Sequence, residues 1–425
     1  MAITIKAPTA LHTHFFGPLL TGLSQLKGFR SCPRLSDHDW LQMGISRALE
    51  GVGSGRAFLQ SMVGKLRLPT VSFFFGVLKS KRRLALCVEA NATLCSTLTA
   101  TVPDAFAAYP ALASFDLYAA DGHAHAAAAH DLPQPSKTSQ TGFAKFATSH
   151  IYSLNLRTHG LSHLSVADQI TRRKEHEMRT LKRLTIAQFR QGAPIGRKVL
   201  YIYDLACLDY SFWHRLKTQG IYFLTRLKSN ASLIKCGDLE FDAQDPINAG
   251  VLFDRQVGIA GRMVRHVAYQ CPRSGEIFDF LTNEMTIPPG LIARLYQMRW
   301  DIEKSYDEIK NKLNEKKAWA SSPTAKAMQA QFICLAHNLM VLQEHHLLVG
   351  EQVTNTSEIK RKAGRQKEVI AVLTGKKRVL PVLQQDFQRH TQRSVKYVRW
   401  LRAFLFLEVP WHDVVAILRE SYRIP

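Results

Sequence analysis

Four side chains of different chemistry stand at helical spacing in one segment of the sequence: Tyr296, Arg299, Glu303 and Lys310. In a helix that turns about 100° per residue, they lie within roughly 60° of one another on one face. Arginine binds phosphate through paired hydrogen bonds and lysine acts as a point charge. A carboxylate between these cations therefore suits a metal ligand beside a bound phosphate. The alternative interpretation is a solvated helix with an ordinary Arg299–Glu303 surface pair.

The composition favours a polyanionic partner. The chain has 425 residues, of which 46% are hydrophobic, enough for two or three domains with sizeable cores. Its 56 lysines and arginines outnumber 34 aspartates and glutamates, which gives a formal net charge of +22. Such a surplus repels itself unless a polyanion offsets it, and nucleic acid is the commonest such partner. A basic protein that is merely soluble is the alternative.

The seven cysteines are scattered and form no Cys-x-x-Cys pair, which argues against a disulfide framework and a cysteine-rich zinc site. We expect reduced thiols in a cytosolic protein. The first twenty residues lack the pattern of a secretory signal, and no stretch approaches the 18 or so apolar residues that span a bilayer. These features predict a protein that stays in the cytoplasm, where its DNA would be, and that is not associated with a membrane.

The elements that must position the four side chains belong to a region where strand-like and helix-like segments alternate, which indicates an α/β domain. Two strand-like runs end in an aspartate, Ala113–Ala120 before Asp121-Gly122 and Lys198–Tyr203 before Asp204. The other expected elements are strands at 146–156 and 221–227, a basic helix at 165–190, a helix at 212–220, a β-rich insertion at about 229–285, and a long helical region after 288–290.

The two ends of the chain differ from this region. Residues 1–105 are expected to form a helical N-terminal domain, in which Ser36 caps a helix that runs to Leu49. Its basic residues Lys79, Lys81, Arg82 and Arg83 suit DNA binding or plain packing equally.

Residues 346–425 are expected to form a basic, mainly helical C-terminal region. Between 360 and 402 there are thirteen lysines and arginines against Glu368 and Asp386, with Tyr397 and Trp400 among them. This segment predicts DNA-backbone contacts or dimer contacts. A tail that only keeps the protein soluble is the alternative.

The spacing Tyr-x2-Arg-x3-Glu-x6-Lys, with Trp300 after the arginine, resembles the signature of the insertion-sequence-four family of DDE transposases. The resemblance covers roughly residues 112–345 and implies an RNase H-like mixed sheet flanked by helices, within a catalytic domain at 106–345. It also implies two further carboxylates at strand ends, and Asp121 and Asp204 stand at the matching positions.

What the resemblance implies for chemistry is a DNA transposase of a bacterial insertion sequence. Asp121, Asp204 and Glu303 would hold two Mg²⁺ or Mn²⁺ ions that support cleavage and strand transfer. Tyr296, Arg299 and Lys310 would bind phosphates of the element's end, and Trp300 would pack beside them. The family cuts and pastes its element, so we expect double-stranded DNA as partner and a homodimer on that DNA.

Several alternatives stay open at this point. Asp121 is followed by Gly-His-Ala-His, so His123 and His125 could form a local transition-metal site. Asp116 and Asp131 are rivals for the place of Asp121, and Asp209 is a rival for that of Asp204. For the whole chain, the rival functions are a catalytically inactive DNA-binding relic and an RNase H-like nuclease without strand transfer.

Overall fold

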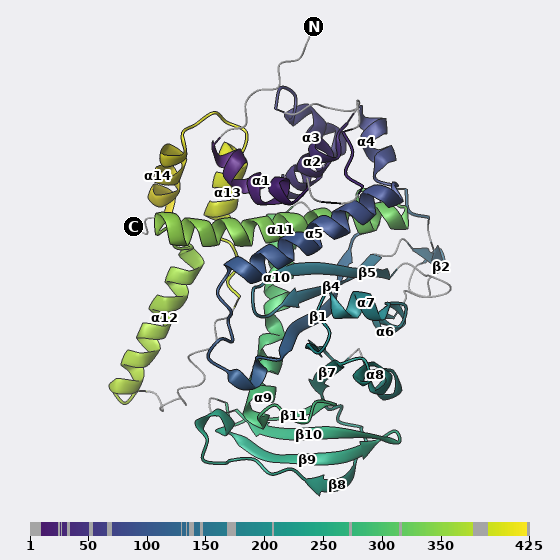
Figure 1. Ribbon diagram of the computed structural model, residues 1–425, viewed down its shortest axis with the longest axis vertical. Helices are drawn as coiled ribbons and strands as arrows, with labels where there is room; N and C mark the ends of the chain where they lie inside the picture. The colour runs from purple at the N-terminus through teal and green to yellow at the C-terminus, as the bar shows by residue number, and fades with distance from the viewer. Residues whose placement is uncertain are drawn as a thin grey trace.

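The computed structural model describes residues 10–23, 26, 28–31, 35–50, 54–65, 70–128, 130–132, 134–135, 140–144, 148–167, 176–205, 208–271, 274–313, 317–376 and 390–422. Its centre is a mixed sheet, and helices lie on both sides of that sheet and beyond one end of it (Figure 1).

Within the described residues the large sheet has nine strands, in the order β5-β4-β1-β6-β7-β11-β10-β9-β8. The strands are β1 (Phe115–His125), β4 (Thr148–Asn155), β5 (Leu161–Ala167), β6 (Lys198–Ile202), β7 (Ile221–Arg226), β8 (Ile234–Asp238), β9 (Val251–Ile259), β10 (Arg262–Gln270) and β11 (Ile277–Thr282). Strands β5, β4 and β1 pair antiparallel, whereas β1, β6 and β7 pair parallel. This arrangement confirms the expected RNase H-like α/β fold.

The β-rich insertion extends the same sheet. Its last strand, β11, pairs antiparallel with β7 from Phe280↔Arg226 to Thr282↔Leu224. Strands β10, β9 and β8 then follow outward as an antiparallel ribbon at the far end of the molecule (Figure 1). The insertion is therefore anchored through backbone hydrogen bonds beside the strand that follows Asp204.

Alternate residues of β1 face two different cores. Phe115, Leu117 and Ala119 belong to a large apolar cluster that includes α5 (Lys81–Thr101), α9 (Pro289–Met298), α10 (Trp300–Lys312) and α11 (Pro323–Glu351). Tyr118 and Ala120 belong to a second cluster with α6 (Glu177–Leu181), α7 (Ile186–Arg190) and α8 (Tyr210–Lys217). Because side chains alternate along a strand, odd-numbered residues of β1 point toward α10 and even-numbered ones toward α6.

The helix expected at 165–190 is wrong. Residues 161–167 form β5, which pairs with β4, and the shorter helices α6 and α7 come later in the segment. Residues 168–175 lie outside the described part of the chain. The pairing partner explains the difference, because β4 is available as an edge and its hydrogen bonds outweigh the weak helix preference of a Ser- and His-containing segment.

The N-terminal region is helical, as expected. It contains α1 (Ala10–Leu23), α2 (Asp37–Leu49), α3 (Gly55–Ser61), α4 (Val71–Val77) and α5. Ser36 caps α2 by accepting a hydrogen bond from the backbone of Asp39. Two of the basic residues for which DNA binding and packing were equal alternatives pair with the buried Asp37: Arg82 Nη1 at 2.7 Å and Arg83 Nε at 3.1 Å.

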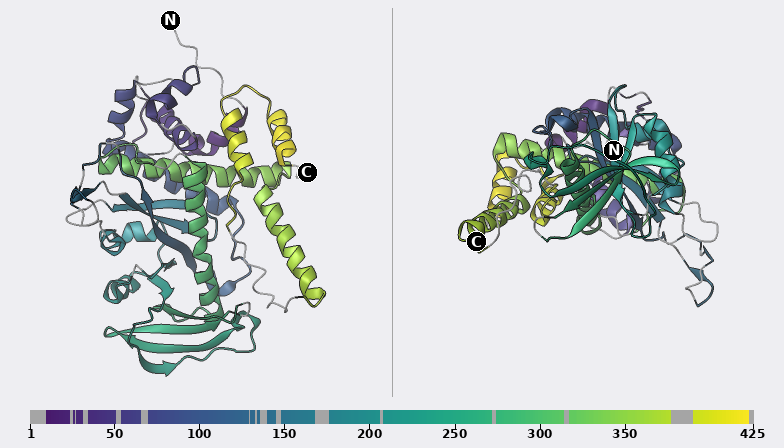
Figure 2. Two further views of the ribbon diagram at one scale, coloured as in Figure 1. Left: turned by 180° about the vertical axis from the view of Figure 1, so that it is seen from behind. Right: turned by 90° about the horizontal axis from the view of Figure 1, so that it is seen from below.

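The C-terminal region contains α12 (Thr356–Leu373), α13 (Val395–Phe404) and α14 (Trp411–Tyr422). Tyr397 and Trp400 are 0% and 4% exposed, so they pack in the core and are not available to contact DNA. In Figures 1 and 2, α12 leaves the end of α11 and projects beside the rest of the molecule. No helix in the described part of the chain is both long and apolar enough to cross a membrane.

Candidate active site

Asp121 and Asp204 are brought together by the register of two parallel strands. The last residue pair between β1 and β6 is Ala119↔Ile202. Asp121 and Asp204 each follow two residues later, so they stand at the same level and point to the same side of the sheet. Thr225 Oγ donates a hydrogen bond of 3.0 Å to the backbone carbonyl of Asp204, which fixes the chain where β6 ends.

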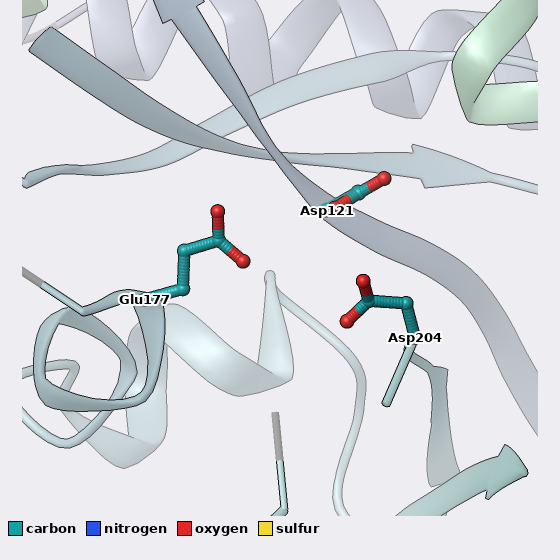
Figure 3. Close-up of side chains that lie close together, drawn as sticks. All are labelled: Asp121, Glu177 and Asp204. Atoms are coloured by element: carbon teal, nitrogen blue, oxygen red, sulfur yellow. The ribbon is translucent and has the colours of Figure 1, made fainter. Parts of the chain in front are cut away.

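A third carboxylate, Glu177, comes from the opposite side of the sheet. One carboxylate oxygen each of Asp121, Glu177 and Asp204 lies within 4.8 Å of the others, and no other such group of three His, Cys, Asp or Glu ligands occurs among the described residues. Figure 3 shows Glu177 and Asp204 directed into the space that they share with Asp121. Hard oxygen donors at this spacing are the ligands that Mg²⁺ and Mn²⁺ prefer.

Gly122 makes room for Glu177. Its missing side chain would point toward α6, where a β-carbon would stand 2.2 Å from Glu177 Oε1 and 2.6 Å from Glu177 Cδ. Any larger residue therefore has to displace the glutamate. The strand does not end before Asp121 as expected, because β1 continues to His125 and pairs with β4 throughout that stretch. Within β1, the Asp-Gly pair combines a carboxylate on one side of the strand with a gap on the other.

Glu303 approaches Asp121 from α10, next to Arg299. Arg299 Nη1 lies 3.5 Å from Asp121 Oδ2 and 3.7 Å from Glu303 Oε1. Tyr306, one turn along α10, donates a hydrogen bond of 2.6 Å to the backbone carbonyl of Asp121. This buried tyrosine ties α10 to β1 and holds Glu303 beside Asp121.

The crowding of carboxylates changes the acidity of Asp121. Burial, a hydrogen bond with Glu303 and the charges of Glu303 and Asp204 raise the pKa of Asp121 to about 8. Arg299 lies within ion-pair distance of two of these carboxylates, Asp121 and Glu303. A bound divalent cation would further offset the negative charge of the neighbouring carboxylates.

The remaining residues of the signature lie around this cluster. Tyr296 on α9 is half-buried, and its ring is 5.1 Å from that of Phe280 on β11. Trp300 is 58% exposed, with the Arg299 guanidinium 5.2 Å from its ring centre. Lys310 is exposed two turns beyond Glu303. The segment is not one continuous helix, because α9 ends at Met298 and α10 begins at Trp300, with Arg299 at the junction.

The rival aspartates have structural partners. Asp116 pairs with Arg197 at 2.7 Å, and Asp131 pairs with Lys326 at 3.2 Å. Asp209 caps α8 by accepting a hydrogen bond of 2.9 Å from the backbone of Phe212. None of the three belongs to the carboxylate group described above.

His123 and His125 form ring contacts. His125 is buried and stacks on His150 with 3.9 Å between ring centres, and His123 stacks on Tyr306 at 4.7 Å. Neither belongs to a group of three or more potential metal ligands among the described residues. Burial lowers the pKa of His123 to about 4 and that of His125 to about 3, so both rings are neutral near pH 7.

Sequence reasoning missed Glu177 and Tyr306. Tyr306 follows Glu303 by three residues, so helical periodicity could have placed it on the same face. For Glu177 no local signal exists, because it belongs to a five-residue helix and meets Asp121 only through the tertiary structure.

An RNase H-like sheet with acidic side chains that could hold a metal ion, one within β1 and one just after β6, defines the class of α/β domain to which the protein belongs. Comparison with known families identifies the domain more specifically. Residues 124–339, slightly more than half of the chain, match the family described as Transposase DDE domain. The protein therefore belongs to the transposase DDE domain family.

A relative is known from Sinorhizobium fredii (strain NBRC 101917 / NGR234), where it has the name "Putative transposase y4zB". The two sequences are 26% identical over 160 residues, which cover 35% of this chain and 45% of the relative. The similar part therefore spans less than half the length of that protein. The family match includes Glu177, Asp204 and Glu303 but begins three residues after Asp121.

Proposed function

We propose that the protein is the transposase of a bacterial insertion sequence of the insertion-sequence-four type, which cuts DNA at the ends of its element and joins them to target DNA. The proposal is supported by the match to the DDE domain family, by the cluster of Asp121, Asp204 and Glu177, and by Arg299, which lies between Asp121 and Glu303. Cut-and-paste movement by a homodimer in the cytoplasm is part of the proposal.

The carboxylates would hold two divalent ions, Mg²⁺ or Mn²⁺. Asp121 and Asp204 would be shared ligands because they stand level on adjacent strands, with Glu303 on one side and Glu177 on the other. When bound, the ions supply an activated oxygen nucleophile and stabilise the leaving oxygen of an in-line displacement.

The cationic residues of the chain would bind and orient the DNA phosphate. Arg299 is 8% exposed and is held by two carboxylates, so its guanidinium is already positioned beside the metal site. Tyr296 and the exposed Lys310 would add phosphate contacts on either side of Glu303 along the chain, and Trp300 offers an exposed ring beside Arg299. Together they would fix one DNA strand against the carboxylates and reduce the freedom of the scissile phosphate.

The domain limits are proposed as 1–105, 106–345 and 346–425, with the insertion at about 229–285. The N-terminal and C-terminal parts would contact DNA or the second protomer, and the central part would carry out the chemistry. An RNase H-like nuclease without strand transfer is the second candidate, favoured by the carboxylate cluster alone, because that cluster supports hydrolysis equally well.

The test uses purified protein, a labelled duplex that carries the element's end, an unlabelled target duplex and Mg²⁺ or Mn²⁺. We expect metal-dependent cleavage followed by joining, both reduced at least 1,000-fold in Glu303→Gln while DNA affinity changes less than threefold, as estimates for a residue that acts only on chemistry. Cleavage without joining would identify the nuclease, and binding without cleavage would identify the inactive relic. Equal cleavage by Glu303→Gln would reject the assignment of this carboxylate.

A further inference from the structure

Helix α12 is a basic, exposed element whose role the proposed active site leaves open. It contains five lysines and arginines and two glutamates. Lys360, Lys362 and Lys367 are exposed, and among the described residues no carboxylate lies within ion-pair distance of them. Arg361, by contrast, pairs with Glu358. The three lysines therefore form a free positive surface, which we call the α12 lysines.

An apolar stripe runs between these lysines. Ile359, Ile370 and Leu373 are 37%, 58% and 80% exposed, and helical geometry places them within roughly 60° of one another. Lys360 and Lys367 border the stripe on one side, and Lys362 borders it on the other. An 18-residue helix with so much exposed apolar surface has little stability of its own, so a partner is expected.

The base of α12 is pinned to the segment that returns from it. Asn355 Nδ2 donates hydrogen bonds to the backbone carbonyl of Gln392 at 3.0 Å and to Glu344 Oε1 at 2.8 Å. Thr391 Oγ donates to Glu358 Oε2 at 2.9 Å. These contacts fix where α12 leaves the body of the protein.

The returning segment, His390–Arg393, lies against the back of α10. Asp301 Oδ2 accepts from the backbone of His390 at 2.9 Å, and Glu308 Oε2 accepts from that of Arg393 at 2.6 Å. Lys312 Nζ donates to the carbonyl of Arg393 at 2.6 Å. These three α10 residues lie roughly 140–180° around the helix from Glu303. The base of α12 is thus fastened to the helix that carries Glu303. Gln392 Nε2 also donates to Asp307 Oδ2 at 2.8 Å, and Asp307 lies about 40° around α10 from Glu303.

We propose that α12 is an arm that binds the phosphate backbone of double-stranded DNA. The proposal rests on the proposed function. A second copy of α12 laid on the apolar stripe would place lysine against lysine on both flanks, whereas DNA offers regularly spaced negative charges with apolar sugar carbons between them. Because the base of the arm is fixed to α10, DNA bound along α12 is held at a set position relative to Glu303.

The experiment measures binding of a labelled, random-sequence duplex without metal, from 50 to 300 mM salt. The variant is the triple substitution Lys360→Gln, Lys362→Gln, Lys367→Gln in the full chain. Loss of three phosphate contacts should make the fall of log affinity with log salt shallower, by about 2 to 3 in slope. It should also weaken binding at 0.1 M salt by about 10- to 100-fold. The rate at which the variant cleaves DNA that carries the element's end, measured at a saturating concentration of that DNA, should stay within threefold of the wild-type rate.

A charge-matched control changes three exposed lysines outside the N-terminal and C-terminal parts, Lys228→Gln, Lys235→Gln and Lys317→Gln. If this control loses as much affinity as the α12 variant, net charge explains the effect and the proposal is overturned. A wild-type slope in the α12 variant also overturns it, and the proposed function then stands as long as the wild-type protein binds and cleaves. If Ile370→Ser with Leu373→Ser turns a dimer into a monomer while the lysine variant binds normally, a second copy occupies the stripe. A wild-type protein without any DNA affinity would reject both proposals.

Discussion

Replacing Gly122 by alanine tests whether Glu177 belongs to the metal site. The new β-carbon would stand 2.2 Å from Glu177 Oε1, against at least 3.4 Å for an ordinary contact, so the carboxylate must move by about 1.2 Å. Metal ligands tolerate about 0.2 Å, and a displacement near 1 Å at a reacting centre costs about 100-fold in rate. We therefore expect Gly122→Ala to cleave end DNA about 100-fold more slowly at fixed Mg²⁺.

The same substitution should leave the fold intact. The displaced atoms are the far end of a flexible side chain, so the free energy of unfolding should change by less than about 1 kcal/mol. The assay is single-turnover cleavage at several Mg²⁺ concentrations, together with urea unfolding. Gly237→Ala is the matched control, because a β-carbon at this strand position of β8 meets nothing within 4 Å.

The expected effect of Gly122→Ala depends on Glu177 being a metal ligand. Glu177→Gln should slow cleavage to a similar degree, and Gly122→Ala should add less than threefold when Glu177 is already changed, because both substitutions remove the same ligand. Wild-type cleavage by Gly122→Ala at every Mg²⁺ concentration would refute the role of Glu177. Additive losses in the double variant would show that the glycine acts by another route.

Three further outcomes are expected. Gly44→Ala should lower the free energy of unfolding by about 1–3 kcal/mol in urea titrations, because its β-carbon would stand 2.1 Å from the ring of Phe332 on α11. Arg393→Ala should cost about 3–5 kcal/mol by the same measurement, since it leaves the fully buried Glu308 without its guanidinium partner. His125 has a folded pKa lowered to about 3 by burial, below about 6.5 when unfolded, so the unfolded chain binds its proton first as pH falls. Stability is therefore complete above pH 6.5 and falls by about 1.4 kcal/mol per pH unit toward pH 3 through this group, and His125→Gln should reduce the measured slope accordingly.

Each of these outcomes has a control or a contrary result. Gly17→Ala should not destabilise, because a β-carbon there meets nothing within 4 Å. Equal stability of Arg393→Ala and wild type would mean that Glu308 finds another partner or a proton. An unchanged slope in His125→Gln between pH 6.5 and 4 would mean that other buried histidines account for the acid sensitivity.

The local features of this protein could be predicted from its sequence. Ser36 predicts the start of α2 because a side-chain oxygen can accept from the first turn of a helix whatever the helix packs against. The apolar runs before Asp121 and Asp204 predict two strands, and β1 and β6 carry those runs, although β1 continues through Asp121 to His125. The spacing from Tyr296 to Lys310 is a property of the sequence alone, so it could be recognised before the fold was known.

The tertiary structure is needed to explain which residues contact these elements. Segment 161–167 became a strand because β4 offers it an edge, and Arg299 stands at a break between two helices. Glu177 reaches Asp121 from the other side of the sheet through the gap at Gly122, at a sequence separation that no periodicity spans. Local propensity and spacing act along the chain, whereas these contacts depend on strand register and on which faces pack together, which are properties of the whole fold.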